Sequence, residues 1–358
     1  MIVNNNERLI ANWLTVCCIV IFGMIILGGV TRLTHSGLSM VEWRPLLGII
    51  PPLTEAEWMR VFTIYKASPE YQLINFGMDL AGFKSIFLFE YLHRVLGRLI
   101  GMLYFVPLVI FWMRGQIPSD VKGRLVLFLI LGGCQGLLGW FMVKSGLVDD
   151  PRVSQYRLAS HLGLAIFLYS CLVWLAFELH ARARGVQKSA TAILAPWPIA
   201  LIALVFIMCL SGALVAGTRA GFAYSTWPLM GNSFIPDGLY SMTPWWKSIF
   251  EDITTVQFNH RMFAYVLIVL IGYWCVDLWG KGLRLASACV AVALTVQVLL
   301  GISALLLHVP VAIGAAHQGG SAVLLTALIF AERSLAWSRQ TVTVNRTASV
   351  MPAQLGPA

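Results

Sequence analysis

The sequence predicts an all-α integral membrane protein with eight transmembrane helices that form two parallel-repeat four-helix bundles, and three observations predict this fold. First, 58% of the 358 residues are hydrophobic and only 11% are charged, whereas a soluble domain carries about 25% charged residues. Second, the hydrophobic residues gather in eight long runs. Third, short polar motifs recur in the same order in the two halves of the chain.

Each of the eight apolar runs is long enough to cross a bilayer, which takes about 20 residues of helix. Continuous apolarity, without alternation between polar and apolar residues, excludes the strands of a membrane β-barrel. The predicted spans, in chain order, are 11–33, 85–112, 124–143, 158–179, 195–217, 257–279, 285–307 and 311–332.

The distribution of Lys and Arg predicts how these spans are oriented. Basic residues concentrate in short stretches, which the positive-inside rule places in the cytoplasm together with both termini. These residues are Arg114, Lys122, Arg124, Arg182, Arg184, Lys188, Lys281, Arg284, Arg333, Arg339 and Arg346. The topology accounts for the net charge of +9, so no nucleic-acid partner is expected. The start of the chain shows neither a cleavable signal nor an organelle presequence, which favours a bacterial plasma (inner) membrane.

The first outer loop, about residues 34–84, is too long for a simple connection. Its stretch 54–71 carries apolar residues at the spacing of one helical face, namely Trp58, Val61, Phe62 and Tyr65. This pattern predicts an amphipathic helix on the membrane surface. An ordinary packed loop is the alternative.

A polar, basic linker, residues 181–194, divides the chain into two halves of four spans each. Residues 1–180 form the predicted N-terminal bundle, and residues 195–334 form the predicted C-terminal bundle. Residues 335–358 are expected to be a disordered cytoplasmic tail. Because each half has an even number of spans, both halves insert with the same orientation and form parallel repeats.

Four short motifs occur once in each half and in the same order. The pairs are Thr31-Arg32 with Thr218-Arg219, His93-Arg94 with His260-Arg261, Gln135 to Gly139 with Gln297 to Gly301, and His161 with His317. Four matching pairs in one order indicate an internal duplication. Two four-helix bundles side by side are the simplest architecture for it.

Each half contributes one pair of histidines near the outer ends of its second and fourth spans. His93 and His161 belong to the N-terminal half, and His260 and His317 belong to the C-terminal half. Two imidazoles that face each other across a bundle can ligate one haem iron, and an apolar bundle suits a buried porphyrin. The pattern therefore predicts two haem sites, although a lone histidine in a span is more often a hydrogen-bond partner between helices.

Other polar residues near the same depth are candidates for supporting roles. Gln135 and Gln297 can hydrogen-bond a ligand histidine or a haem edge, or they can join helices. Arginines of the repeats can pair with anionic haem propionates or reach the lipid headgroups. These arginines are Arg32, Arg94, Arg219 and Arg261. The remaining histidines, which are assigned no ligand role, are His35, His180 and His308.

One residue breaks the symmetry between the halves. Glu90 stands three residues before His93, on the same helix face. At the matching position before His260 the residue is Gln257. A carboxylate in apolar surroundings is costly, and it is a functional hypothesis by default. Glu90 can stabilise positive charge on an oxidised carbon or move a proton; the alternative is an ion pair with a nearby arginine.

These residues make the chain resemble the haem A synthase family over essentially all eight spans. The resemblance rests on the Glu-x-x-His-Arg segment at Glu90, the His-Arg segment at His260, the histidines 161 and 317, and the duplication of four spans. It implies an integral membrane oxidoreductase that oxidises the C8 methyl group of haem O to a formyl group through a hydroxymethyl intermediate. The product, haem A, would serve the assembly of cytochrome c oxidase.

The resemblance also implies different roles for the two halves. The C-terminal half would hold a permanent haem b on His260 and His317, and this haem would relay electrons. The N-terminal half would bind the substrate haem O and the product haem A at His93 and His161. Glu90 would be the catalytic carboxylate.

In one respect the chain departs from part of the family. Some members carry two cysteines in the first outer loop, but this loop has none between Thr34 and Lys84, and the seven cysteines of the chain all lie in apolar runs. The chain therefore resembles the branch without that pair. Its electron donor stays open, a ferredoxin-type donor included. Haem O synthase, cytochrome c oxidase assembly proteins and a second copy of the chain are further partners left open.

Two other functions are compatible with the histidines. A dihaem b-type protein that only transfers electrons would use all four of them but would leave Glu90 without a role. A transporter built from parallel repeats would use the histidines as proton relays. It would need helices broken at the membrane centre, and the sequence shows little sign of such breaks.

Overall fold

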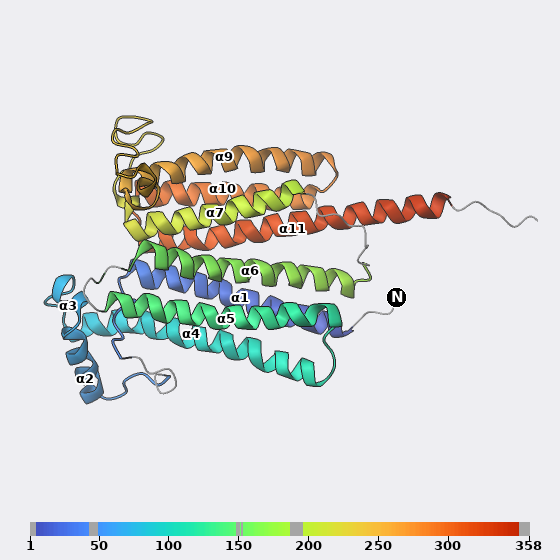
Figure 1. The fold of residues 1–358 in the computed structure, drawn as a ribbon. Coiled ribbons are helices and arrows are strands. Elements are labelled where there is room, and N and C mark those ends of the chain that lie inside the picture. Colours follow the sequence, from blue (N-terminus) through green and yellow to red (C-terminus); the bar gives the residue numbers. More distant parts are fainter. Residues whose placement is uncertain (1–4, 43–48, 148–150, 152, 187–195, 351–358) are drawn as a thin grey trace, which may run out of the picture.

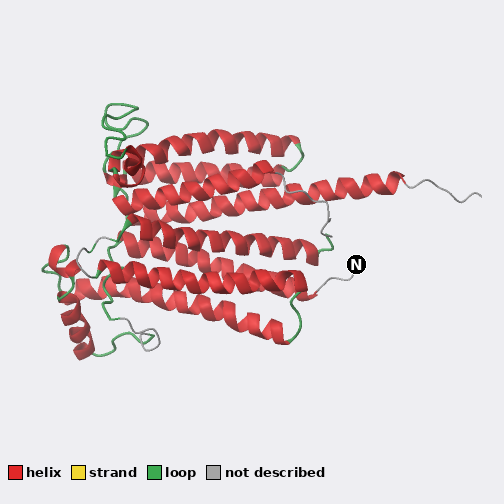
Figure 2. Cartoon of the chain, viewed as in Figure 1, coloured by secondary structure: helices red, strands yellow, loops and turns green. Residues whose placement is uncertain are grey.

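The computed structural model of the protein describes residues 5–42, 49–147, 151, 153–186 and 196–350. Its α-helices are α1 (Asn5–Leu33), α2 (Glu55–Lys66), α3 (Pro69–Leu73), α4 (Leu80–Met113), α5 (Ser119–Gly146), α6 (Gln155–Ala183), α7 (Pro196–Thr218), α8 (Ser248–Glu251), α9 (Ile253–Gly280), α10 (Arg284–Leu306) and α11 (Val311–Val350). Within these residues the structure contains helices, turns and loops but no strand (Figure 1, Figure 2).

Eight of the described helices are long and apolar enough to cross a membrane, so the protein is a multi-pass membrane protein. They are α1, α4, α5, α6, α7, α9, α10 and α11, and each covers one predicted span. Most extend several residues beyond the predicted bounds, because long polar side chains beside a span can keep their charged ends in water while the helix continues. The prediction of an all-helical membrane protein is confirmed.

The last helix differs from its predicted span at the C-terminal end. The structure continues α11 to Val350, whereas the sequence predicted a span ending near residue 332 and a disordered tail over 335–358. The residues from 339 to 350 are polar, but they include no Gly or Pro that would end a helix. The tail prediction is therefore corrected as far as Val350. Residues 351–358 and the linker residues 187–195 lie outside the described part of the chain.

The membrane-spanning helices pack in two closed rings of four. In the N-terminal ring, α1 and α5 each contact both α4 and α6; in the C-terminal ring, α7 and α10 each contact both α9 and α11. Between the rings, α6 contacts α7 and α11, and α1 contacts α11 (Figure 1). We compared the most apolar stretch of 18 residues in each of these helices. In that stretch 50% of the residues of α6 and 44% of those of α11 are buried, but only 6% of those of α5. The centre of the molecule therefore lies at α6 and α11, while the equivalence of the rings as a repeat stays a prediction.

The two ends of the bundle differ in their covering. We call the end that carries α2 and α3 the cap end, and the end where α1 begins the tail end (Figure 1). At the cap end, α2 begins with a capping box: the Thr54 side chain accepts from the Glu57 N–H, and the Glu57 carboxylate accepts from the Thr54 N–H. The predicted helix over 54–71 is thus confirmed as α2 and α3.

The apolar face of α2 packs on α4 rather than on lipid. The rings of Phe62 and Tyr65 each stack on Phe83 of α4 with centroids 5.0 Å apart, and all three side chains are buried. Trp58 meets Phe87 of α4 edge-on at 5.1 Å. Such aromatic pairs are worth about 0.5–1.5 kcal/mol beyond the area that they bury. The predicted placement on the membrane surface is corrected, because α4 begins at Leu80 and offers α2 an aromatic surface.

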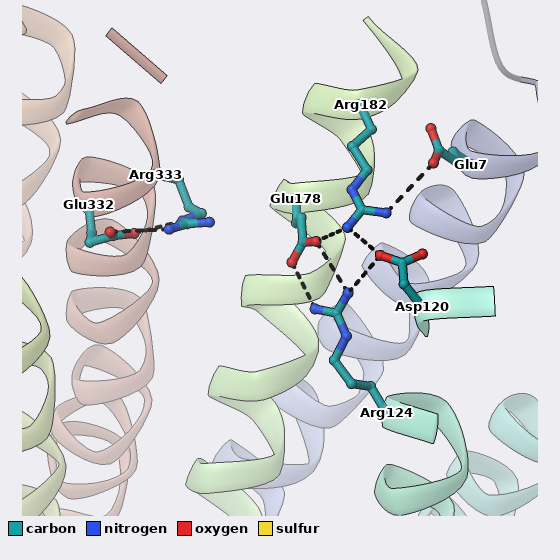
Figure 3. Close-up of polar contacts among 7 residues, drawn as sticks. All are labelled: Glu7, Asp120, Arg124, Glu178, Arg182, Glu332 and Arg333. Carbon is teal, nitrogen blue, oxygen red and sulfur yellow. Dashed lines mark hydrogen bonds and ion pairs between the residues drawn. The ribbon is translucent and has the colours of Figure 1, made fainter. Parts of the chain in front are cut away.

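At the tail end, an ion-pair network joins three helices of the N-terminal ring (Figure 3). Arg182 of α6 lies 2.8 Å from Asp120 of α5 and 3.8 Å from Glu7 of α1, and it also pairs with Glu178 of its own helix. Arg124 of α5 lies 2.8 Å from Glu178. A network of this size fixes the relative position of the helices better than isolated surface pairs do.

A second polar contact at this end crosses between the two rings. Glu332 and Arg333 of α11 are buried and form an ion pair of 2.6 Å (Figure 3). The Arg333 guanidinium also lies 4.1 Å from the ring centre of Trp174 on α6. This cation–π contact ties the C-terminal ring to the N-terminal ring and leaves the cap end free for other roles.

Candidate functional site

The four histidines of the repeated motifs lie on α4, α6, α9 and α11. In each ring the two helices that carry them stand on a diagonal, because each packs on both of the other helices more closely than on its partner across the ring. His93 lies within electrostatic range of His161, and His260 lies within range of His317. The structure therefore brings together one pair of imidazoles in each bundle, and all four side chains are partly buried.

Each of these imidazoles rests against a glycine of the preceding membrane-spanning helix. A methyl group in place of the glycine hydrogen would lie 2.8–3.4 Å from the ring. The pairs are Gly28 with His93 at 3.1 Å, Gly139 with His161 at 2.9 Å, Gly212 with His260 at 3.4 Å, and Gly301 with His317 at 2.8 Å. We call these four glycines the glycine seats of the imidazoles. Below 3.0 Å a side chain would have to displace the ring, so the contacts at Gly139 and Gly301 are the tightest. The sequence showed these two glycines in the Gln motifs without indicating this contact.

The ring nitrogens are largely free of hydrogen bonds to the described part of the protein. Nδ1 of His93 and Nδ1 of His317 are buried and have no hydrogen-bond partner among the described residues. Nδ1 of His161 is likewise buried without a partner, whereas Nδ1 of His260 lies 3.1 Å from the hydroxyl of Ser211. A buried polar atom left unpaired costs about 1–3 kcal/mol. Imidazoles with an unpaired nitrogen, on diagonal helices of an apolar bundle, fit the axial ligands of a haem iron.

The two glutamines of the repeats each contact the second histidine of their ring. Nε2 of Gln135 lies 3.5 Å from Nε2 of His161, and Nε2 of Gln297 donates to the backbone carbonyl of His317 at 3.1 Å. Both amide oxygens are buried without a partner within the described residues. Gln135 is therefore placed to orient the ring of a ligand histidine, which is one of the two roles that the sequence left open. Gln297 joins α10 to the backbone of α11, which is the other role.

Glu90 and Arg94, one turn apart on α4, hold the chain that follows α1. Oε2 of Glu90 accepts from the hydroxyl of Ser39 at 2.8 Å and from the N–H of Met40 at 2.7 Å. Its Oε1 accepts from Arg94 at 2.5 Å, and Arg94 also donates to the carbonyl of Met40 at 2.9 Å. The carboxylate is buried, and its two oxygens accept three hydrogen bonds. The ion pair that the sequence left as an alternative for Glu90 is thus present.

Gln257 and Arg261 hold the corresponding chain after α7. Nε2 of Gln257 donates to the carbonyl of Tyr224 at 3.0 Å. Arg261 is buried and donates to the carbonyls of Tyr224, Thr226 and Leu229 at 2.9–3.2 Å. Both rings therefore use the same two helix positions to hold a cap-end segment, but the glutamine donates where the glutamate accepts.

The four arginines of the repeats divide into two kinds. Arg94 and Arg261 are engaged in holding the cap-end segments, as described above. Arg32 closes α1 and Arg219 follows α7, and the two lie within electrostatic range of each other where the rings adjoin. Neither has a carboxylate partner within the described residues. Two neighbouring cations without an acid form a site that favours an anion.

The other histidines stay outside the paired arrangement. His180 contacts the hydroxyl of Thr15 at 3.1 Å near the tail end. His35 and His308 stand in turns with φ of 52° and 60°. The described residues contain no group of three or more His, Cys, Asp or Glu side chains that could hold a bare metal ion.

A buried carboxylate that the sequence did not single out lies in the cap. Glu70 of α3 is only 3% exposed, and it accepts a hydrogen bond of 3.2 Å from the Tyr65 hydroxyl. Burial, followed by the nearby charge of Glu90, raises the pKa of Glu70 to about 7, although the Tyr65 hydrogen bond acts in the opposite direction. In the sequence Glu70 looked like an ordinary acid of a polar loop. Its position one residue inside a Ser-Pro helix start, between Tyr65 and Tyr71, was the available signal.

The chain is similar to known proteins over most of its length. The model of the COX15-CtaA family, described as a cytochrome oxidase assembly protein, matches residues 11–329. The chain is 47% identical over 335 residues to the protein named "Heme A synthase" from Nitrosospira multiformis, with 92% of the chain and 94% of the relative covered. It is 44% identical over 335 residues to the protein of that name from Parvibaculum lavamentivorans, with 92% and 95% covered. For the one from Paramagnetospirillum magneticum the identity is 45% over 339 residues, with 93% and 95% covered.

Proposed function

The chain belongs to the COX15-CtaA family of cytochrome oxidase assembly proteins, and we propose that it is a haem A synthase. It is a membrane-bound oxidoreductase that takes haem O as substrate and oxidises the C8 methyl group to the formyl group of haem A. The family match over most of the chain and the curated relatives named "Heme A synthase" support this activity. The two diagonal pairs of imidazoles supply ligands for two haems.

The two rings take different haems in this proposal. His260 and His317 ligate a permanent haem b, which supplies electron transfer when it is bound. His93 and His161 bind the substrate haem O and release haem A. The glycine seats support both assignments, because each seat holds an imidazole against a helix face, and Nδ1 of His93, His161 and His317 has no hydrogen-bond partner within the described residues. Gln135 orients the His161 ring through its nitrogen, and Gln297 holds the backbone of His317 in the other ring.

The observation that carries the catalytic assignment is the comparison of Glu90 with Gln257. Gln257 holds a cap-end segment without any charge, so this task does not require a carboxylate. Burying a charge costs several kcal/mol unless its partners compensate for it, yet Glu90 is buried and paired with Arg94 on the helix that carries His93. The carboxylate therefore provides a fixed negative charge beside the substrate, where positive charge develops on the carbon that is oxidised. Its alternative task, also proposed from the sequence, is to accept a proton from the substrate.

The structure narrows the candidates for the propionate partners. Arg94 and Arg261 are committed to the cap-end segments, so they hold the cap in place. Arg32 and Arg219 are close together at the boundary between the rings and have no acid beside them. We assign the anionic propionates of the haems to these two arginines.

Location and partners follow from the topology. The short basic connections lie at the tail end, which supports a cytoplasmic tail end with both termini, and haem sites near the outer face of a bacterial plasma membrane. The organisms of the relatives are bacteria, in agreement with this location. The electron donor, a ferredoxin-type protein included, haem O synthase, other assembly proteins and a homo-oligomer remain candidates for partners.

A dihaem b-type electron-transfer protein is the second candidate function. The observation in its favour is that Glu90 already has three hydrogen-bond partners, so its carboxylate has a structural task. In that case both rings would hold the same kind of haem.

Extraction of the pigment distinguishes these functions. The full chain is expressed in cells that make haem O but no haem A, and the haems of the purified protein are separated by chromatography. The proposal expects haem A or its hydroxymethyl precursor next to haem B. Haem B alone would point to the electron carrier, and a colourless protein would point to a transporter.

A further inference from the structure

One glutamine of the C-terminal ring reaches across the boundary between the two rings. Gln318 of α11 follows directly after His317, and its Nε2 donates to the backbone carbonyl of Ile25 on α1 at 2.6 Å. Ile25 is buried, and α1 and α11 pack on each other along this boundary. A polar contact therefore joins the helix of a haem b ligand to a helix of the other ring.

Two successive glycines of α1 connect this contact with the first imidazole pair. Gly28 is the glycine seat of His93, where a methyl group would lie 3.1 Å from the imidazole. Gly29, which is buried, lies against Gln318, and a methyl group there would be 3.3 Å from the amide. Close contacts therefore lead from His93 through α1 to the residue beside His317.

The boundary between α6 and α7 offers a comparison within the same protein. There Gly163 of α6 packs against an apolar side chain of α7, as Gly319 of α11 packs against apolar side chains of α1. Both glycines stand two residues after the paired histidine of their helix. Between histidine and glycine the residue is Leu162 on α6 but Gln318 on α11. Because a leucine is sufficient for packing, the amide of Gln318 serves a purpose beyond packing.

This hydrogen bond contributes direction more than stability. A single hydrogen bond between membrane-spanning helices adds little to the stability of a membrane protein. The Ile25 carbonyl lies inside α1, where the N–H four residues later is its helical donor, so loss of the amide would leave no buried acceptor unpaired. A hydrogen bond has a preferred distance and angle, whereas apolar contacts are non-directional. The amide of Gln318 is therefore suited to fixing the position of α11 against α1.

From this geometry we infer that Gln318 is a positioning residue for electron transfer: it fixes the haem b ring against α1 and thereby against the substrate ring. The inference rests on the proposed function, in which one electron at a time passes from the iron of the C-terminal ring to the iron of the N-terminal ring. The first iron is oxidised from Fe(II) to Fe(III), and the second is reduced from Fe(III) to Fe(II). A one-electron donor outside the chain then returns the first iron to Fe(II). Because this transfer needs a fixed geometry, a small shift between the rings costs rate.

A second hydrogen bond between the rings provides a matched control. The hydroxyl groups of Tyr169 on α6 and Thr326 on α11 lie 2.9 Å apart. Thr326 stands eight residues after Gln318, which is about 12 Å farther along α11 toward the tail end. Tyr169→Phe therefore removes a hydrogen bond of the same boundary at a distance from the imidazoles.

The experiment compares Gln318→Leu with Tyr169→Phe in the full-length protein. Leucine is the residue that α6 carries at the matching position, so the variant keeps the packing and loses only the amide. Haem A is added to the purified protein that holds haem b, so the measurement does not depend on the oxidation of haem O. A photoreduced flavin delivers one electron after a light flash. Because haem A absorbs at longer wavelength than haem B, the absorbance follows the electron from one ring to the other.

Gln318→Leu should slow this transfer roughly tenfold, while the haem b spectrum and the midpoint of thermal unfolding stay as in wild type. Tyr169→Phe should transfer the electron at the wild-type rate. Gly29→Ala, which crowds the Gln318 amide from the side of α1, should also slow the transfer. This variant tests the same contact if Gln318→Leu does not assemble.

Equal transfer rates in wild type and the two variants of the contact would overturn the inference. An equal loss of rate in Tyr169→Phe would also overturn it, because any hydrogen bond between the rings would then have the same effect. The same holds for wild-type protein in which no electron reaches haem A. By contrast, wild-type protein that transfers the electron but never converts haem O overturns only the proposed oxidation.

Discussion

The cap end is built differently over the two rings. Over the N-terminal ring, α2 and α3 close the end with a cluster of buried aromatic side chains. Over the C-terminal ring the chain forms loops and short turns, in which Trp245 and Trp246 are 62% and 49% exposed. At the matching helix positions a buried carboxylate holds the cap-end segment of the first ring, and an amide holds that of the second. Both rings have the imidazole pair, the glycine seats and a glutamine at the same positions. The two rings therefore differ mainly in the residues around these groups.

This comparison separates the residues that bind a haem from the residues that take part in oxidising one. Features shared by the rings, such as the imidazole pair, serve a task that both rings perform. Features confined to the N-terminal ring, such as Glu90, add buried charge, which is costly in an apolar protein. They belong to a task that the C-terminal ring does not perform, and substrate oxidation is such a task.

The largest expected effect comes from the second imidazole pair. Replacing His260 or His317 with Ala removes an axial ligand of haem b, so the low-spin haem b signal should be lost almost completely. The matched variants His93→Ala and His161→Ala should retain it. Visible spectra of the reduced purified proteins make this measurement. A signal that survives in the His260 and His317 variants would place the permanent haem in the other ring.

The second largest effect concerns Glu90 and Gln257, the two matching residues that hold a cap-end segment. Glu90→Ala should lower haem A formation by roughly a hundredfold, because the fixed charge beside the substrate is lost. Haem b should stay bound. Gln257→Ala, the control in the other ring, should leave haem A formation within a few-fold of wild type. Chromatography of extracted haems gives both readings, and normal haem A output from Glu90→Ala would remove the catalytic assignment.

The glycine seats should give a smaller effect that is specific to each ring. In Gly301→Ala the new methyl group would lie 2.8 Å from the His317 ring, so the ring must shift and haem b should bind several-fold more weakly. In Gly139→Ala, which crowds His161, haem A formation should fall while haem b is retained. Gly136→Ala has open space and is the control. Spectral titration with haem measures the first effect. If all three variants behave alike, Gly139 and Gly301 do not control the position of the imidazoles.

The smallest expected effect separates the two kinds of arginine. Arg261→Met leaves three carbonyls of the cap-end segment without a donor and should destabilise the fold by on the order of 3 kcal/mol. Arg219→Met should cost less than about 0.5 kcal/mol, because the guanidinium is exposed and holds no backbone group. Thermal unfolding in detergent compares them. A similar loss in both variants would show that Arg219 also holds the cap.

The sequence predicted some elements of the protein completely, others only in part, and missed one. All eight spans were found because hydrophobicity is a property of each segment by itself. The helix over 54–71 was found from its spacing, but its placement was wrong, since α4 and not the membrane covers its apolar face. Glu90 was found because a duplication supplies its own comparison, with Gln257 as the reference. Glu70 was missed, because nothing in a polar loop indicates which acid will be buried.

By itself, the sequence determined the number of membrane-spanning helices, the presence of two histidine pairs and the single acid that distinguishes them. These follow from composition and from motifs that repeat along the chain. The tertiary structure alone decided which glycine supports which imidazole, which arginines are left for an anion and which acid of the cap is buried. The physical reason is that these properties depend on neighbours far apart in the chain: Gly28 meets His93, and Phe62 of the cap meets Phe83 of α4, only after the helices have packed.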